Sequence, residues 1–235
     1  FNQAENQTSN VSNRGTAKAA ITNEVVPNAK SQMPNTSISK NTKIRVVGEI
    51  WCNYIIAELY SGEESLEILI IDKHAAHERI IYEKLKSKNN IISQFLMSPC
   101  TILNTDEEYA AICENLPLLK RLGFEFDLSN KPYISVLAVA DYFAYIDVND
   151  LMGDMLLDLL KGANFNSPER KIDDLLHTLA CKAAVKSGDI TGTKELQSLA
   201  EQAAYNPNIR HCPHGRPVMF GIKKTELEKQ FRRRV

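Results

Sequence analysis

Three side chains that can bind a metal ion or move a proton lie close together in the sequence: Asp72, His74 and Glu78. Residues 66–71 form a short apolar run, which predicts a buried strand that ends at Asp72. A helical pattern follows, and at about 100° per residue it places His74, Glu78 and Ile81 in one narrow stripe. Two ionisable side chains therefore continue an apolar helix face, where they are costly unless paired or bound to a cation.

The residues of this stretch leave two interpretations open. Asp72 can be the N-cap of the helix, with His74 and Glu78 as a hydrogen-bonded pair four residues apart. Alternatively, the carboxylates and the imidazole hold a metal ion. The stretch alone favours the first interpretation, and the rest of the chain favours the second.

A second group of ligand-type residues lies in the loop 212–217, which reads Cys-Pro-His-Gly-Arg-Pro. Cys212 and His214 are two positions apart in a loop that is stiffened by prolines and turned by a glycine. A thiolate and an imidazole at this spacing can reach one ion, and both are zinc-type ligands. Cys181, by contrast, is by itself typical of a free cysteine that packs as a small hydrophobe.

Composition separates residues 1–43 from the rest of the 235-residue chain. They hold few large apolar side chains and are rich in Asn, Ser, Thr, Gln, Ala and Lys, so we expect a disordered linker. Because the sequence opens on Phe1 rather than Met, we expect it to be the C-terminal part of a longer protein. No apolar run reaches the roughly 18–20 residues of a membrane span, so no membrane partner is expected.

Charge and cysteine content narrow the class of protein further. The net charge of −1 argues against a generally basic nucleic-acid binder. Residues 210–235 nevertheless carry eight Lys or Arg against two Glu, so the tail is either a patch that attracts phosphate weakly or a solvated helix. Five widely spaced cysteines without a secretion signal indicate reduced thiols in a cytoplasmic protein.

The remaining pattern predicts an α+β fold. Strands over 43–51, 54–60 and 66–71 precede the helix of His74, and a strand over 218–222 comes late in the chain. Residues 105–175 have elements of their own and read as an insertion without chemistry. The first element expected in this insertion is a helix from Thr105 to Gly123, which Pro117 should kink or split. Strands near 124–128 and 133–140 and a helix over 149–161 are expected to follow. Further helices are expected from Pro168 to about Ala183 and over 193–204.

Gln94–Pro99 is a short segment of a different kind. A Gln ahead of Phe, Leu and Met, ended by Pro, is typical of an extended peptide that fills a pocket on another protein. An ordinary edge strand whose apolar residues pack within the protein is the alternative, and the segment alone favours it.

Four motifs, in the same order, resemble those of the C-terminal region of the bacterial MutL family of DNA mismatch-repair proteins. Asp72-Lys73-His74-Ala75-x-x-Glu78-x4-Glu83 is similar to the family's endonuclease signature, with Lys73 where Gln is usual. Ala180-Cys181-Lys182, the loop 212–217 and Phe231-Arg232-Arg233 resemble the other three, and the loop matches without a mismatch. Gln94–Pro99 lies where bacterial members carry a peptide that binds the sliding clamp. The resemblance covers residues 44–235.

The resemblance implies a homodimer that nicks one strand of duplex DNA by two-metal phosphodiester hydrolysis. It implies a small sheet-and-helix subdomain for dimerisation, metal binding and catalysis (44–104 and 176–235) and an inserted α/β regulatory subdomain (105–175). ATP is expected to act only through an N-terminal domain outside this sequence. The expected partners are a second copy of the chain, double-stranded DNA, the replication sliding clamp and, through the full-length protein, the mismatch-recognition protein MutS.

The same resemblance assigns roles to individual residues. The metal ligands it implies are Asp72, His74, Glu78, Cys181, Cys212 and His214. Among them the catalytic residues are Asp72 and Glu78, whose oxygens suit Mn²⁺ or Mg²⁺, whereas the imidazoles and thiols suit Zn²⁺. A metal pair can activate water and stabilise the departing 3′ oxygen. The residues expected to bind the clamp are Gln94, Leu96 and Pro99, and those expected to bind DNA are Arg216, Arg232 and Arg233.

Three neighbouring residues are not assigned to the metal. Glu83 lies on roughly the opposite side of the helix from Glu78. His77 occupies a position that the family does not fix. Lys73 is expected to place a cation beside the site, which should favour phosphate but weaken metal affinity.

A rival interpretation is a zinc-stabilised dimerisation and clamp-docking module without nuclease activity. Cys and His ligands fit that role as well as a catalytic one. Asp72 separates the two interpretations, because a structural zinc site closed by Cys and His does not need it.

Overall fold

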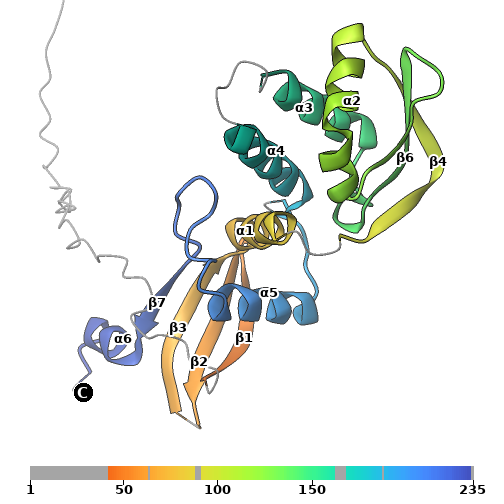
Figure 1. Ribbon diagram of the computed structural model, residues 1–235. Helices are drawn as coiled ribbons and strands as arrows, with labels where there is room; N and C mark the ends of the chain where they lie inside the picture. The colour runs from red at the N-terminus through yellow and green to blue at the C-terminus, as the bar shows by residue number, and fades with distance from the viewer. Residues whose placement is uncertain (1–41, 63, 88–90, 162–167, 187, 234–235) are drawn as a thin grey trace, which may run out of the picture. The chain divides into compact units, whose positions relative to one another are not determined.

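The computed structural model describes residues 42–233 except 63, 88–90, 162–167 and 187, all within the unit Ser31–Val235 (Figure 1). Of the predicted linker, residues 1–41 lie outside the described residues, and Thr42 and Lys43 begin a strand. The described part is a mixed α+β fold with two antiparallel sheets and six α-helices, as the sequence predicts. None of the described helices is long and apolar enough to cross a membrane.

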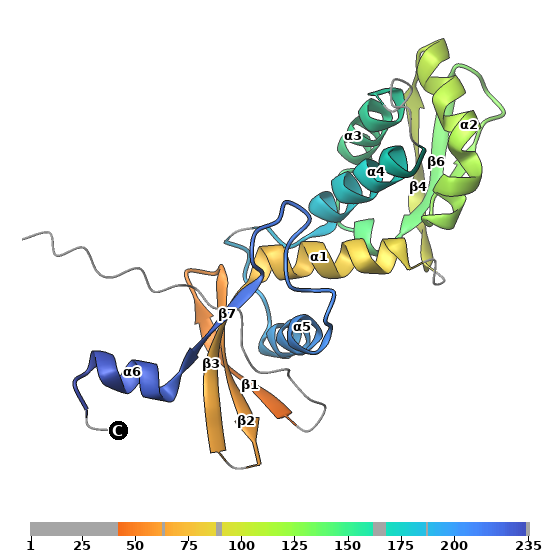
Figure 2. The ribbon, with the colours of Figure 1, turned by 60° about the vertical axis from the view of Figure 1, so that its left-hand side comes forward.

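The first sheet has four strands in the order β1-β2-β3-β7. Their bounds are β1 (Thr42–Ile50), β2 (Tyr54–Ser61), β3 (Glu64–Asp72) and β7 (Met219–Lys223). Alternate side chains point to opposite faces, and one face is fully buried, as at Ile55, Leu69 and Met219. Helices α1 (Lys73–Lys86) and α5 (Thr193–Tyr205) pack on this face, and α6 (Lys224–Gln230) follows β7 (Figures 1 and 2).

The second sheet has three strands in the order β4-β6-β5. Its elements are β4 (Ser93–Leu103), β5 (Glu125–Asp127), β6 (Tyr133–Ala140), a 3-10 turn (Asp141–Phe143) and helices α2 (Asp106–Arg121), α3 (Val148–Lys161) and α4 (Pro168–Ala183). The predicted capping box at Thr105 is confirmed, since Thr105 and Glu108 each accept the other's backbone N–H. Helix α2 runs unbroken through Pro117, so the predicted split does not occur. Ile112 and Leu119 flank the proline and are both fully buried, which holds the two halves in line.

The strand β4 pairs with β6 and so belongs to the second sheet. The sequence interpretation grouped residues up to 104 with the first sheet, because the strong local signal is the helix cap at Thr105. Strand pairing is non-local and gives no such signal. The roles assigned to the two parts, dimerisation with catalysis and regulation, stay predictions.

Helix α1 belongs to both hydrophobic cores. Ala76 and Ile80 pack in the core under the first sheet, whereas Ile81, Tyr82 and Leu85 pack in the core of the second. Helix α4 in turn packs on both α1 and α3. A side chain on α1 is therefore held by packing on two sides, which is a rigid base for a site.

Candidate metal centre

Asp72 lies at the point where β3 ends and α1 begins. Its Oδ1 accepts a hydrogen bond from the backbone N–H of Ala75 at 2.9 Å, so the N-cap interpretation of Asp72 is confirmed. Its own backbone N–H donates to the carbonyl of Val218 at 2.9 Å, just before β7. The capping bond uses one carboxylate oxygen and fixes the direction of the side chain, so capping and a role in a site are compatible.

Glu78, Cys212 and His214 form a compact group. One ligand atom from each lies within 4.8 Å of the others, and Nδ1 of His214 is 3.6 Å from Oε1 of Glu78. Glu78 is only 2% exposed, and its Oε1 has no hydrogen-bond partner among the described residues. A buried carboxylate oxygen without a partner is costly, and a cation would satisfy it. A thiol, an imidazole and a carboxylate are a donor set that fits zinc.

The loop that carries Cys212 and His214 is held by its own backbone. The N–H of Cys212 donates to the carbonyl of Arg216, and the N–H of Gly215 donates to the carbonyl of Cys212, each at 2.8 Å. Gly215 has a φ of +80°, a conformation that side-chain-bearing residues rarely adopt. The turn buries Cys212 and leaves His214 63% exposed, so the group has a dry side and an open side.

A hydrogen bond to Val185, a residue outside the compact group, orients His74. Its Nδ1 lies 2.8 Å from the carbonyl oxygen of Val185, and because a carbonyl only accepts, the ring donates there. The neutral ring then carries its lone pair on Nε2, as in metal-binding histidines whose other nitrogen donates to a backbone carbonyl. The structure does not bring His74 within ligand distance of the compact group.

His77 forms a hydrogen bond with the backbone of the same residue, Val185. The N–H of Val185 donates to Nδ1 of His77 at 3.0 Å. Burial, followed by the charges of Lys84 and His74, lowers the pKa of His77 to about 4, so the ring is neutral at pH 7. Together His74 and His77 fasten the end of α4 to the first turns of α1.

Cys181 lies on an exposed face of α4, outside the compact group. Desolvation, and then the negative charge of Glu78, raise the pKa of its thiol. The Glu78 carboxylate is thus close enough for its charge to affect the Cys181 thiol. The thiol is nevertheless not within ligand distance of all three members of the compact group.

Sequence reasoning missed His177, which also lies beside the group. Its ring stacks on Tyr82 with centroids 4.5 Å apart, and its centroid is 6.5 Å from that of His214. A signal was available: His177 precedes Cys181 by four residues, the spacing that drew attention to His74 and Glu78.

The prediction for Lys73 is wrong, because its ammonium does not face a phosphate site. The side chain is fully buried and its Nζ lies 2.5 Å from Oε1 of Glu49. It also donates to the carbonyl of Asp189 at 2.6 Å and to Oγ1 of Thr191 at 3.2 Å. Lys73 therefore joins β1, α1 and the segment before α5, and it has no open path to a phosphate.

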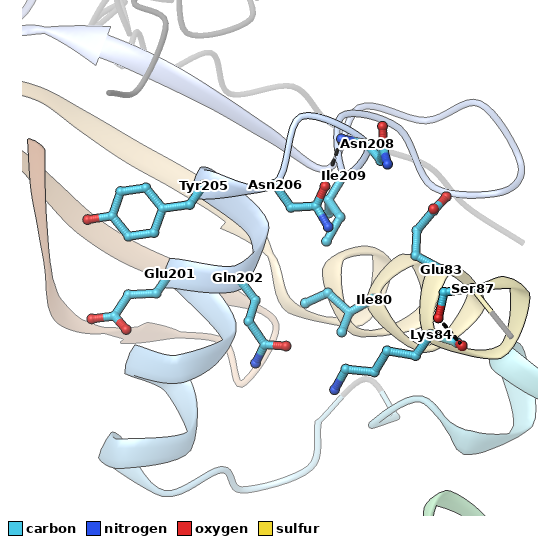
Figure 3. Close-up of a pocket in the computed structure, with 10 residues that line it drawn as sticks. All are labelled: Ile80, Glu83, Lys84, Ser87, Glu201, Gln202, Tyr205, Asn206, Asn208 and Ile209. Atoms are coloured by element: carbon cyan, nitrogen blue, oxygen red, sulfur yellow. Dashed lines mark hydrogen bonds between the residues drawn. The ribbon is translucent and has the colours of Figure 1, made fainter. Parts of the chain in front are cut away.

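Glu83 faces away from Glu78, as its helical position predicts. It pairs with Arg79 at 2.7 Å and lines a pocket of about 560 Å³ between α1 and α5 (Figure 3). The other side chains around this pocket include Lys84, Glu201 and Tyr205. The pocket lies on the side of α1 opposite to the compact group, so it is not part of that site.

The residues predicted to bind the clamp lie on β4, which is an edge strand of the second sheet. Its pairing with β6 is interrupted between Phe95 and Cys100, where the strand bulges. Met97 is completely exposed and Phe95 is 68% exposed. Gln94 and Pro99 are also exposed, whereas Leu96 packs against the second core.

The arginines predicted to bind DNA lie in two places. Arg216 is exposed in the same turn as His214. Arg232 and Arg233 are exposed beyond the end of α6, which packs on β3 and β7. Arg216 is thus the one of the three that shares a loop with the compact group.

Comparison with known proteins identifies relatives over most of the chain. Residues 49–191 match the family described as the MutL C terminal dimerisation domain. The chain is 34% identical over 205 residues to the DNA mismatch repair protein MutL of Kosmotoga olearia, covering 87% of this chain and 33% of that protein. The MutL of Clostridium botulinum (strain Kyoto / Type A2) is 34% identical over 217 residues, with 90% and 31% covered, and that of Clostridium tetani is 28% identical over 219 residues, with 92% and 34% covered. The chain spans about a third of the length of these relatives.

Proposed function

The chain belongs to the family of MutL C-terminal dimerisation domains, and from that premise we propose that it is the metal-dependent, DNA-nicking part of a MutL protein. The observation that carries the proposal is the buried Oε1 of Glu78, which faces a thiol and an imidazole without a hydrogen-bond partner among the described residues. A buried carboxylate oxygen without a partner is costly, and a bound cation would offset that cost. Asp72 lies at the start of the same helix and adds an oxygen donor that a purely structural zinc site does not need.

The residues of the chain divide the chemistry between them. Glu78, Cys212 and His214 would hold a zinc-type ion, with Asp72 and His74 as further donors and Mn²⁺ or Mg²⁺ as the ion of the hydrolytic step. A bound divalent ion supplies activation of water and stabilisation of the departing 3′ oxygen. The Oδ1 of Asp72 is fixed by Ala75, so its second oxygen is preoriented. Arg216, on the turn that carries His214, supplies a cation for a phosphate of the strand.

Nicking of supercoiled plasmid in Mn²⁺ tests the enzyme against the rival zinc-stabilised module. We expect Asp72→Asn to lower the nicking rate by about 100-fold or more. Because Asn caps a helix about as well as Asp, the melting temperature and the dimer should not change. Asp174→Asn, an exposed position on α4, is the matched control and should nick normally. A nicking rate in Asp72→Asn equal to that of the wild type would refute the catalytic proposal.

The family indicates a homodimer, and we propose that the outer face of the first sheet is where the second copy binds. Ile56, Ile70 and Phe220 lie side by side across β2, β3 and β7 on the face away from α1 and α5. They are only partly buried, and Val47 and Trp51 nearby are 61% and 79% exposed. Apolar surface of this kind fits an interface between copies. Ile70→Glu should give a monomer in sedimentation, whereas a dimer would place the interface elsewhere.

A second function, docking on the replication sliding clamp, is favoured by the bulge in β4. An edge strand whose pairing is broken and whose Phe95 and Met97 are exposed can offer an extended peptide to a partner. Duplex DNA as substrate, control by ATP and contact with the mismatch-recognition protein MutS belong to the proposed role of the whole protein. Its place would be the cytoplasm, where the five free cysteines stay reduced.

A further inference from the structure

Trp51 is the only tryptophan of the chain, and it is 79% exposed. It lies with Cys52 in the turn that joins β1 to β2. Both residues have positive φ angles, +52° and +51°, which side-chain-bearing residues rarely adopt. A two-residue turn of this kind is usually built from Asn and Gly. The chain thus adopts a strained backbone to carry a large aromatic ring, and such strain is typical of functional positions.

Hydrogen bonds fasten this turn to α1 and to the segment before α5. The carbonyl of Asn53 accepts from the N–H of Lys73, the first residue of α1, at 2.9 Å. The N–H of Gly188 donates to Oδ1 of Asn53 at 3.1 Å. The ring of Trp51 meets that of Tyr54 edge-on, with centroids 6.1 Å apart. The indole is therefore exposed to solvent and yet held in place.

The turn lies next to Asp72. Tyr54 and Asp72 are opposite each other in the pairing of β2 with β3. Since such neighbours lie about 5 Å apart and Trp51 contacts Tyr54, the indole is roughly 10 Å from the Asp72 carboxylate. On the other side of Asp72, its N–H donates to the carbonyl of Val218, which follows the turn of Arg216. Asp72 thus lies between an exposed aromatic ring and an exposed cation.

We propose that Trp51 binds the substrate strand by stacking on one of its bases. Nucleotides of one strand are about 3.4 Å apart along the axis of duplex DNA, so the base would be roughly three nucleotides from the phosphate at Asp72. Aromatic stacking accepts any base, and an apolar side chain that enters between bases kinks the duplex. The inference rests on the proposed function, since it takes the phosphate to be held beside Asp72. It assigns a DNA contact to a turn that none of the four motifs contains.

A second copy of the chain is the other candidate occupant, because Trp51 borders the face proposed for the dimer. Two observations favour DNA. The ring lies beyond Ile50, the last residue of β1, and not on the face of the sheet. In addition, Arg216 offers a cation for the phosphates on the far side of Asp72.

Intrinsic fluorescence tests the proposal directly, because Trp51 is the only indole of the chain. The probe is a short DNA duplex with one unpaired thymine, whose base leaves the stack more easily than a paired one. Without added Mn²⁺, so that the strand stays intact, we expect this duplex to quench the emission of the purified chain. The matched control is Trp51→Phe with Tyr145→Trp, which moves the indole to a fully exposed position after β6. Its emission should not change.

Binding and nicking give the size of the effect. Trp51→Ala should weaken binding of the same duplex about 10-fold, since it removes one base–aromatic stack. The DNA concentration at half-maximal nicking should rise by a similar factor. Trp51→Phe keeps an aromatic ring and should recover most of the loss. Val47→Ala, an exposed apolar position on β1, is the control and should bind as the wild type does.

The outcomes separate this inference from the proposed function. Equal quenching of the two indoles, or no quenching of Trp51 while the duplex binds, overturns the stacking. A Trp51→Ala variant that sediments as a monomer assigns the ring to the interface between copies and overturns it as well. Wild-type binding and nicking by Trp51→Ala would refute the role of Trp51 and leave the proposed function intact. Quenching of Trp51 in a wild-type chain that nicks no DNA would refute the proposed function and support the stacking.

Discussion

The two sheets of the chain differ in what their cores contain. Under the second sheet the described core is apolar apart from Asn104, whose amide donates to the carbonyl of Ile102. Around the first sheet three ionisable side chains are buried: Glu67 on β3, and Lys73 and Glu78 on α1, the helix that packs in both cores. Burying charge is costly, so this concentration of buried charge around α1 indicates where a site is to be sought.

Buried charges of two kinds occur near α1, and only one kind indicates a site. Lys73 is satisfied, since Glu49, Asp189 and Thr191 all lie within contact distance of its Nζ. Glu78 is unsatisfied at Oε1 among the described residues. The first arrangement is complete without a ligand and serves structure. The second leaves an oxygen without a partner, as expected of a group that binds a cation. The two arrangements therefore give opposite expectations for their substitution.

Substitution of Lys73 should have the largest effect on stability. Lys73→Met leaves the Glu49 carboxylate with side-chain exposure of only 13% and no cation, which we expect to cost about 3–5 kcal/mol of unfolding free energy. The double variant Lys73→Met with Glu49→Leu should recover much of that loss, because no charge then stays buried alone. Urea denaturation of both variants measures the difference. A loss below about 1 kcal/mol in Lys73→Met would mean that the pair is not structural.

Acidification should weaken the fold through His77. The folded pKa is about 4 against an ordinary value of 6.5, so below pH 6.5 the unfolded chain takes up a proton that the folded chain refuses. The contribution of neutral His77 to the free energy of unfolding is therefore fully present above pH 6.5. It is lost as the pH drops toward 4, by about 3 kcal/mol in all. Urea midpoints of the metal-free protein between pH 7 and pH 4.5 measure this slope.

The control for that slope is His77→Gln, which can still accept from Val185. Lys84 and Glu195 also line the space beside His77, and His74 faces it, but these groups are present in both proteins. The difference between the two slopes therefore isolates the imidazole. Parallel slopes would show that His77 takes up its proton normally in the folded state.

Substitution of Glu78 should reverse the result expected for Lys73. Glu78→Gln removes a buried charge that lacks a hydrogen bond at Oε1, so the metal-free protein should be no less stable than the wild type. Zinc affinity should fall by about 10- to 100-fold or more. Titration with a competing chelator measures the affinity, and thermal unfolding in chelator measures the stability. A destabilised metal-free variant would place Glu78 with Lys73 as a structural charge.

Local sequence patterns predicted part of this site and tertiary contacts determined the rest. The strand end at Asp72, the helix after it and the Cys-x-His turn depend on residues within a few positions, so the sequence could predict them. The contacts of Lys73 with Asp189 and of His177 with His214 join segments far apart in the chain. The same holds for β4, whose membership of the second sheet is decided by pairing with β6.

The smallest effect on stability is expected on β4, where the residues proposed to bind the clamp are exposed. Met97 and Gln94 are exposed on the bulge, so Gln94→Ala with Met97→Ala should change the unfolding free energy by no more than about 0.5 kcal/mol. Leu96, which belonged to the predicted docking set, packs against the second core, and its substitution would confuse docking with folding. Zinc content and basal nicking in Mn²⁺ should stay at wild-type values, because none of the residues proposed for either lies on β4.

Stimulation by the replication sliding clamp should vanish in the same double variant. A clamp that encircles DNA acts by raising the effective concentration of the nuclease at its substrate, without new contacts to the phosphates. We expect a chain with a net charge of −1 to hold DNA weakly and therefore to gain from such recruitment. Ile92→Ala, an exposed apolar position just before β4, is the matched control and should keep the stimulation. Stimulation that survives in the double variant would place clamp docking elsewhere, and the second sheet would then have no function of its own among those proposed.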